Sequence, residues 1–276
     1  MRTWIIRGWG SVKEQLYILI LLFIYRLLWG YCLYRFVRSA VVPALLRYPS
    51  ENAGGSAIGR LLYYIEAQLS LSSGTDARRW LWTLLILAAV RLLATPFIRA
   101  GLLHELHQES RGERGLFFFP GMKKYGLPVL LFSAAEWVLT LLPLYWLLPK
   151  GYRLILSSYW EPAMLLRILP YLLAWLLYVF IIRLILLYMQ FGYTGGTGVF
   201  ASLPVALRCL PPASALSALF GAGGLLTSLI CAAAGWLCPG LPALFIRQLA
   251  PLPSTLLDMW GLSAQYHLWR SKTAAL

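Results

Sequence analysis

Long runs of apolar residues alternate with short polar segments along the whole chain. Six of these runs have the length of about 20 mostly apolar residues that a helix needs to cross a bilayer core of about 30 Å. They lie at about residues 14–36, 80–99, 126–149, 165–190, 216–238 and 241–262. Lipid offers the backbone no hydrogen-bond partner, so continuous apolar runs of this length predict helices. The pattern therefore predicts an all-α, polytopic membrane protein with about six transmembrane helices.

Amphipathic segments accompany these runs. In the long 38–79 connection, apolar residues recur at helical spacings of three and four, at Ile58, Leu61, Leu62, Ile65 and Leu69. This stripe predicts a helix lying on the membrane surface, and a lid over a substrate pathway is the alternative. The aromatic and aliphatic residues at 4–9, ahead of the first run, predict a second interfacial helix.

Composition and charge agree with a membrane location. The chain is 60% hydrophobic and 12% charged, whereas soluble domains are about 25% charged. The net charge of +14 comes from basic residues scattered at the ends of the runs, where they contact anionic headgroups, so we expect lipids and not nucleic acid as partners.

The distribution of basic residues orients the chain. With the N-terminus inside, ten lysines and arginines lie on the cytoplasmic side: Arg2, Arg7, Lys13, Arg111, Arg114, Lys123, Lys124, Arg208, Arg270 and Lys272. Seven lie outside: Arg38, Arg47, Arg60, Arg78, Arg79, Lys150 and Arg153. This modest bias predicts a multi-pass protein of the cell membrane with both termini in the cytoplasm, and the 38–79 connection is its weakest part.

No arrangement of residues predicts an enzyme, a metal site or a cofactor. The four cysteines, Cys32, Cys209, Cys231 and Cys238, lie in or beside apolar runs and form no CxxC pair, so we interpret them as small buried residues. In HELHQESRGE, His104 and His107 are three residues apart and do not match HExxH. We interpret that segment as a solvated helix end, and we expect no catalytic residue, no metal and no cofactor.

Charged residues within the apolar runs are the candidate functional residues, because burying them in lipid costs a few kcal/mol on insertion scales. They are Arg26, Arg91, Glu136, Arg183, Arg247 and Asp258. Arg91 and Glu136 are central in neighbouring runs, which predicts an ion pair if the two helices are antiparallel. The pair would hold helices together or, with Arg183 facing the same space, line a polar cavity suited to phosphate, whose geometry an arginine fork matches.

Small residues form a stripe along the fifth run, in FGAGGLLTSLICAAAGW. They recur at spacings of three and four: Gly221, Gly224, Ser228, Ala232 and Gly235. Such a face lets helix backbones approach closely, and it predicts contact with another helix or with a partner subunit. The sixth run is interrupted by Pro251 and Pro253, which predict a kink or a break in the helix.

Two short segments share the pattern G-x-x-G-aliphatic-F. GERGLF at residues 112–117 and GGTGVF at residues 195–200 each follow one apolar run and precede another. The glycines indicate tight turns, which need backbone conformations strained for other residues. We interpret the two segments as the centres of an internal repeat in a single integral membrane domain of residues 1–276, an organisation common in transporters.

The segment WTLLILAAVRLLATPFIRAGLLHELHQESRGERGLFFFPGMKKYGLPVLL resembles six-span bacterial proteins related to the membrane domain of glycerophosphoryl diester phosphodiesterases. Pro96 and Gly101, the glycine turn and the basic, aromatic segment after it carry the resemblance. It implies a six-helix membrane domain. The catalytic barrel of those enzymes, with its metal-binding carboxylates, has no counterpart here, so the resemblance implies no catalytic residue.

The sequence favours a non-enzymatic accessory or regulatory component of a bacterial cytoplasmic membrane, acting with a membrane-protein partner or as a homo-oligomer. The alternative is a small transporter, or a protein that handles a lipid or another anionic substrate. A continuous polar cavity lined by Arg91, Glu136 and Arg183 would favour the alternative. An exposed small-residue face on the fifth run would favour the partner-binding role.

Overall fold

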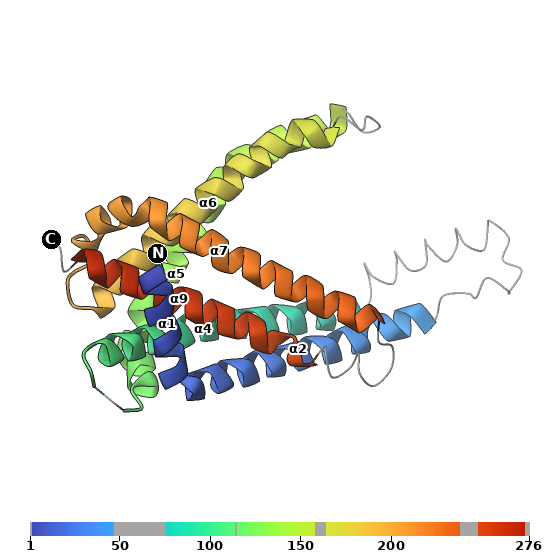
Figure 1. Cartoon of the computed structure of the whole chain (residues 1–276). Coiled ribbons are helices and arrows are strands. Elements are labelled where there is room, and N and C mark those ends of the chain that lie inside the picture. Colours follow the sequence, from blue (N-terminus) through green and yellow to red (C-terminus); the bar gives the residue numbers. More distant parts are fainter. Residues whose placement is uncertain (1, 47–74, 114, 158–163, 238–247, 274–276) are drawn as a thin grey trace, which may run out of the picture. The chain divides into compact units, whose positions relative to one another are not determined.

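The computed structural model describes residues 2–46, 75–113, 115–157, 164–237 and 248–273 (Figure 1). They form seven helices: α1 (Arg2–Glu14), α2 (Leu16–Leu46), α4 (Thr75–Ser110), α5 (Phe118–Ser157), α6 (Met164–Thr194), α7 (Ser202–Leu237) and α9 (Pro251–Thr273). No strand occurs in these ranges. The predicted all-α fold is confirmed.

Five helices are long and apolar enough to span a membrane. The candidate spans are Leu16–Ser39, Arg78–Ser110, Phe118–Pro149, Leu169–Thr194 and Ser202–Leu237. They correspond to the first five apolar runs of the sequence, and they make the chain a polytopic membrane protein. The sixth predicted run, 241–262, overlaps residues 238–247, which lie outside the described residues, and α9 is not among the five.

The chain divides into two compact units. The smaller unit, residues 22–95, contains most of α2 and the first part of α4. There the Tyr25 hydroxyl lies 3.4 Å from the Thr95 hydroxyl, and the Arg91 guanidinium lies 5.7 Å from the centre of the Trp29 ring. The two helices are therefore antiparallel. The interfacial helix predicted at residues 58–69 lies outside the described residues.

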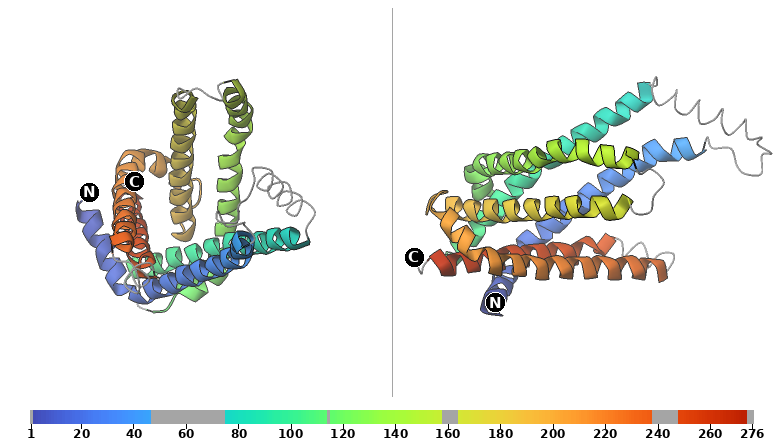
Figure 2. Two further views of the ribbon diagram at one scale, coloured as in Figure 1. Left: turned by 90° about the vertical axis from the view of Figure 1, so that its right-hand side faces the viewer. Right: turned by 90° about the horizontal axis from the view of Figure 1, so that it is seen from above.

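The larger unit, residues 1–21 and 96–276, contains the end of α4 and the helices α1, α5, α6, α7 and α9. Figure 2 shows α5 beside α6 and α7 beside α9, each pair antiparallel. Side-chain hydrogen bonds join these pairs. The Trp175 indole donates to the Thr140 carbonyl at 3.3 Å, and the Gln265 amide donates to the Ser217 hydroxyl at 2.6 Å.

The core of the larger unit lies where the second half of α9 meets the ends of α6 and α7. Tyr188 and Phe191 of α6 and Tyr266 and Trp269 of α9 are each at most 3% exposed. The Phe191 ring centroid is 5.4 Å from that of Tyr266 and 6.0 Å from that of Trp269. Large aromatic side chains bury much apolar surface, and these edge-to-face and tilted contacts add to the stability of the junction.

Glycines bring helices of the larger unit close together at two places. A Cβ atom added at Gly121 of α5 would lie 2.6 Å from the Cβ atom of His104 of α4. A Cβ atom at Gly8 of α1 would lie 2.8 Å from the backbone nitrogen of Ala264 of α9. Both positions need a residue without a side chain, so the α4–α5 and α1–α9 contacts depend on glycine.

The predicted helix ahead of the first apolar run is present as α1, and part of it packs against α9. The Trp9 and Trp260 ring centroids are 4.8 Å apart, and the Trp260 indole donates to the Ile5 carbonyl at 2.8 Å. Ile6 remains exposed. The contact of α1 with a membrane surface stays a prediction.

The proline pair marks the start of α9. Residue 250 forms a turn, and the final helix begins at Pro251. The first residue of a helix needs no N–H donor, so proline fits there, whereas it would break a continuous helix. The predicted break is thus present, and the helix continues to Thr273, eleven residues (273 minus 262) beyond the end of the predicted run.

Both glycine segments contain residues in the left-handed region. The φ angles are +82° at Gly112, +75° at Gly196 and +95° at Gly198. Glycine adopts this conformation without the strain that other residues suffer, which confirms that both segments are glycine turns. In the segment 112–117 the first residue of the motif is left-handed, whereas in the segment 195–200 the second and the fourth residues are. The internal repeat stays a prediction.

Candidate functional site

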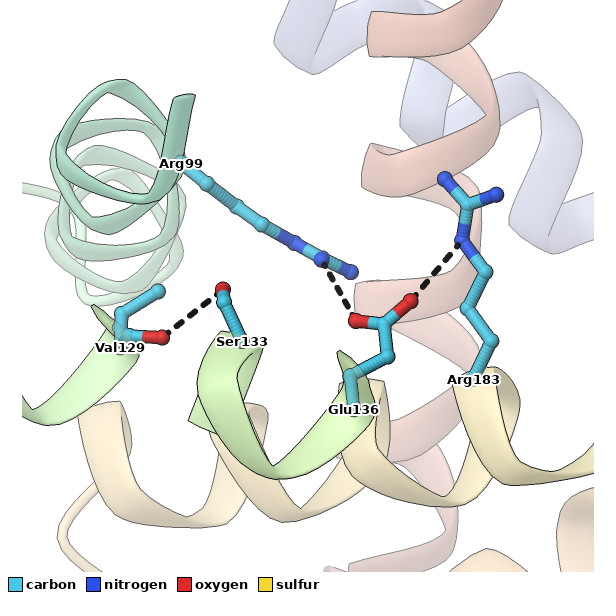
Figure 3. Close-up of polar contacts among 5 residues, drawn as sticks. All are labelled: Arg99, Val129, Ser133, Glu136 and Arg183. Carbon is cyan, nitrogen blue, oxygen red and sulfur yellow. Dashed lines mark hydrogen bonds and ion pairs between the residues drawn. The ribbon is translucent and has the colours of Figure 1, made fainter. Parts of the chain in front are cut away.

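Glu136 of α5 lies between two arginines from neighbouring helices (Figure 3). Its Oε2 atom is 3.8 Å from Nη1 of Arg99 on α4. Its Oε1 atom is 3.9 Å from Nε of Arg183 on α6. One turn earlier on α5, the Ser133 hydroxyl donates to the Val129 carbonyl at 3.0 Å. We call Arg99, Glu136 and Arg183 the charge cluster.

The three members of the charge cluster differ in exposure. The side chains of Arg99 and Glu136 are 21% and 23% exposed, whereas that of Arg183 is 68% exposed. All three lie within candidate spans. With two cations and one carboxylate, the cluster has a net charge of +1. One charge in the apolar part of the chain is therefore not neutralised by Glu136.

The sequence prediction paired Glu136 with Arg91, which belongs to the smaller unit, and that pairing stays a prediction. The arginines beside the carboxylate are Arg99 and Arg183, while Arg91 lies over the Trp29 ring in a cation–π contact. Of the predicted set Arg91, Glu136 and Arg183, the structure thus brings the last two together.

The sequence analysis did not select Arg99, because the second predicted apolar run ends at this residue. The helix α4 in fact passes through Pro96 and continues to Ser110. The apolar segment PFIRAGLLHEL gave the signal, since its leucines continue at helical spacing after Arg99. From Arg91 to Arg99 is eight residues, about 12 Å along a helix, so Arg99 lies about two turns further along α4.

The small-residue face of α7 is bare among the described residues. No atom lies within 4 Å of the place that a Cβ atom would take at Gly221 or Gly224. Ser228 and Ala232 are exposed and Gly235 is half-buried. The helix packs against α9 through another side, where a Cβ atom added at Gly223 would lie 3.7 Å from Cδ1 of Leu257. Within the larger unit, no described residue fills the space beside Gly221 and Gly224.

A buried polar cluster occupies the end of α4, where the sequence analysis expected a solvated helix end. His104 is 9% exposed and Glu105 is 5% exposed. Nδ1 of His107 lies 2.9 Å from the Tyr266 hydroxyl of α9, which is also 3.2 Å from the Ser110 hydroxyl. The solvated interpretation was wrong, because the start of α5 and the helix α9 cover this end of α4.

The final helix supplies further contacts to this polar cluster. Nε2 of His267 lies 2.9 Å from the Ser11 hydroxyl of α1, and the Arg270 guanidinium donates to the Ser110 carbonyl. Burial lowers the pKa of His267 below its usual value, and the nearby charges of Arg7 and Arg270 lower it further. The sequence analysis had assigned no role to His267, because nothing local in the sequence indicates contacts with residues so distant along the chain.

The polar cluster joins α1, α4 and α9 through side-chain hydrogen bonds. No group of three or more histidine, cysteine, aspartate or glutamate residues suited to a metal ion occurs in the described part of the chain. Cys32, Cys209 and Cys231 are free thiols, with Cys209 buried, while Cys238 lies outside the described residues. The charge cluster and the bare face of α7 are therefore the two candidate functional features.

Comparison with known proteins adds no further constraint. No protein-family model matches the chain, and no curated protein and no solved structure matches it. The resemblance to the membrane domain of glycerophosphoryl diester phosphodiesterases stays a prediction.

Proposed function

We propose that this chain is a non-enzymatic accessory component of a bacterial cytoplasmic membrane, which binds a partner membrane protein through α7. One observation carries the proposal: no described residue comes within 4 Å of the place that a Cβ atom would take at Gly221 or Gly224, on the small-residue face of α7. The partner that fits this face is a transmembrane helix of another protein, bearing small residues of its own.

The energetics of glycine support this role. Each glycine in a helix interior costs about 1 kcal/mol relative to alanine. A methyl group would also fit at Gly221 and at Gly224. Packing against the described residues therefore does not require glycine at these two positions. In lipid, where helix association depends on close packing, such residues let a second backbone approach.

The bulky neighbours of these glycines give the face its shape. Leu225 and Leu229 of α7 are 67% and 65% exposed. They follow Gly224 and Ser228 in the sequence and are four residues apart, so they form a ridge along one side of the stripe of small residues. A partner helix can lie along the stripe beside this ridge, in the manner of small-xxx-small contacts.

Photo-crosslinking tests the proposal in living cells. A photoreactive amino acid at Ala232 should give a crosslink to one protein, which mass spectrometry then identifies, and the same group at Leu229 should give a weaker one. Gly224→Leu should abolish the Ala232 crosslink because the side chain blocks the approach.

The matched control is Ala222→Leu, which adds the same kind of side chain at an exposed position on the opposite side of α7, two residues away. A crosslink that survives Gly224→Leu, or that Ala222→Leu removes equally, would contradict the proposal. A crosslink only to a second copy of this chain would replace the accessory role with self-association.

A further inference from the structure

We infer that Arg99, Glu136 and Arg183 form a binding site for one phosphate group, carried either by a lipid headgroup or by a soluble anion. The inference rests on the charge cluster alone and is independent of the partner-binding role of α7.

The charge balance of the cluster calls for an anion. A charged side chain near the centre of a membrane helix costs about 2.5–3.5 kcal/mol on insertion scales. Glu136 offsets the charge of one arginine, and the second arginine remains uncompensated. A phosphodiester group carries a single negative charge at neutral pH, which would bring the cluster to neutrality.

The orientation of Arg183 leaves its phosphate-binding edge available. This side chain faces Glu136 through Nε, and its two terminal nitrogens point away from the carboxylate (Figure 3). Among the described residues, the ion-pair partner of the Arg183 guanidinium is Glu136, which it meets through Nε. A planar guanidinium binds phosphate with two parallel N–H donors, a geometry that lysine does not offer.

The distances in the cluster leave hydrogen-bond donors of the two arginines unsaturated. Separations of 3.8 Å and 3.9 Å between nitrogen and oxygen exceed the 2.7–2.9 Å that is typical of a charge-assisted hydrogen bond. Glu136 therefore holds the two arginines near each other without saturating their donors. A phosphate oxygen could accept from both.

The two arginines lie at the same level in their helices. Arg99 is eleven residues before the end of α4 at Ser110 (110 minus 99), and Arg183 is eleven residues before the end of α6 at Thr194 (194 minus 183). At 1.5 Å per residue, both are about 16 Å from those helix ends. Their side chains meet at one residue, because each arginine forms an ion pair with Glu136.

A purely structural role accounts for only part of the cluster. One arginine and one carboxylate would suffice to join two helices, and Arg99 with Glu136 already joins α4 to α5. Arg183 is the most exposed member, and in a membrane its surroundings would be lipid. A lipid headgroup approaching from the side of α6 is therefore the source of phosphate that we expect.

The experiment uses the full chain in detergent micelles. Native mass spectrometry would measure retention of phosphatidylglycerol, with diacylglycerol, which lacks phosphate, as the comparison lipid. Calorimetry with inorganic phosphate tests the soluble source. We expect one retained phosphatidylglycerol per chain and no retained diacylglycerol.

Variants identify the residues responsible. Arg183→Gln should weaken retention at least about tenfold, because it removes a charged hydrogen-bond donor. Arg183→Lys should give a smaller loss, because it keeps the charge and loses the planar fork. Glu136→Gln should bind at least as tightly as the unaltered chain. The matched control is Arg91→Gln, which removes another arginine of a candidate span and should leave retention unchanged.

Each outcome is decisive. Wild-type retention by a folded Arg183→Gln chain would overturn the inference, and so would an equal loss in Arg91→Gln. If Arg183→Gln does not fold, folded Arg183→Lys decides, and wild-type retention by it again overturns the site. Binding of inorganic phosphate without lipid would identify a soluble anion, binding of lipid alone would identify the headgroup, and binding of neither would refute both.

Discussion

The side chain of His267 on α9 contacts the Ser11 hydroxyl of α1. Its protonation changes the stability of the folded chain. Burial, Arg7 and Arg270 hold its pKa below 6.5 in the folded chain. Below pH 6.5 the unfolded chain therefore binds more protons than the folded chain at this residue. The contribution of His267 to stability is complete above about pH 6.5 and is lost as the pH falls from there toward the lower folded pKa.

We expect the thermal unfolding temperature in detergent to fall as the pH is lowered from about 7.5 to about 5. His267→Gln should flatten this dependence, because glutamine can still reach the Ser11 hydroxyl but does not titrate. Other groups also titrate in this range, so the measured quantity is the difference between the two chains. A difference that does not change with pH would show that His267 has no such effect.

Single residues also show where sequence reasoning reaches its limit. The hydropathy pattern found Glu136 and Arg183, because each stands alone in an apolar run. It placed Arg99 at the very end of its run, since the polar residues after it lower the local hydropathy although the helix continues. Hydropathy does not show where α4 ends, because packing against α5 and α9 determines that end.

At the scale of elements, the contact between α1 and α9 rests on the close approach at Gly8. Gly8→Leu should separate the two helices, because its side chain would meet the backbone of Ala264. Hydrogen–deuterium exchange of the α1 amides, followed by mass spectrometry, should become markedly faster. Gly10→Leu is the control, since no atom lies within 4 Å of its added Cβ position. Equally fast exchange in both variants would show that α1 is held elsewhere.

The existence of the helices was predictable, and several of their ends were not. Apolar runs long enough to cross a bilayer must be helical, so five of the six predicted runs reappear as candidate spans. The extension of α4 to Ser110 and of α9 to Thr273 depends on contacts between segments far apart in the sequence, such as those of Tyr266 with His107 and Ser110. Hydropathy does not report such contacts.

At the scale of the whole molecule, the contact between Ser11 and His267 constrains the topology. Residues in contact outside the apolar spans lie on the same side of the membrane, so α1 and the end of α9 share a side. The five candidate spans, α2, α4, α5, α6 and α7, would by themselves leave the chain on the opposite side. If all five cross the membrane, the shared side predicts a sixth crossing between the end of α7 and His267.

We expect the predicted run at 241–262, which includes the first half of α9, to provide that crossing. It ends before His267, and the described part of α9 runs antiparallel to α7 (Figure 2). The bias of basic residues places the shared side in the cytoplasm. A fused reporter that is active only in the cytoplasm should therefore be active after Leu276 and inactive after Leu237. Activity at both positions would exclude the sixth crossing, and activity at Leu237 alone would exclude the orientation. In the first case, a double-cysteine crosslink would test the Ser11–His267 contact independently.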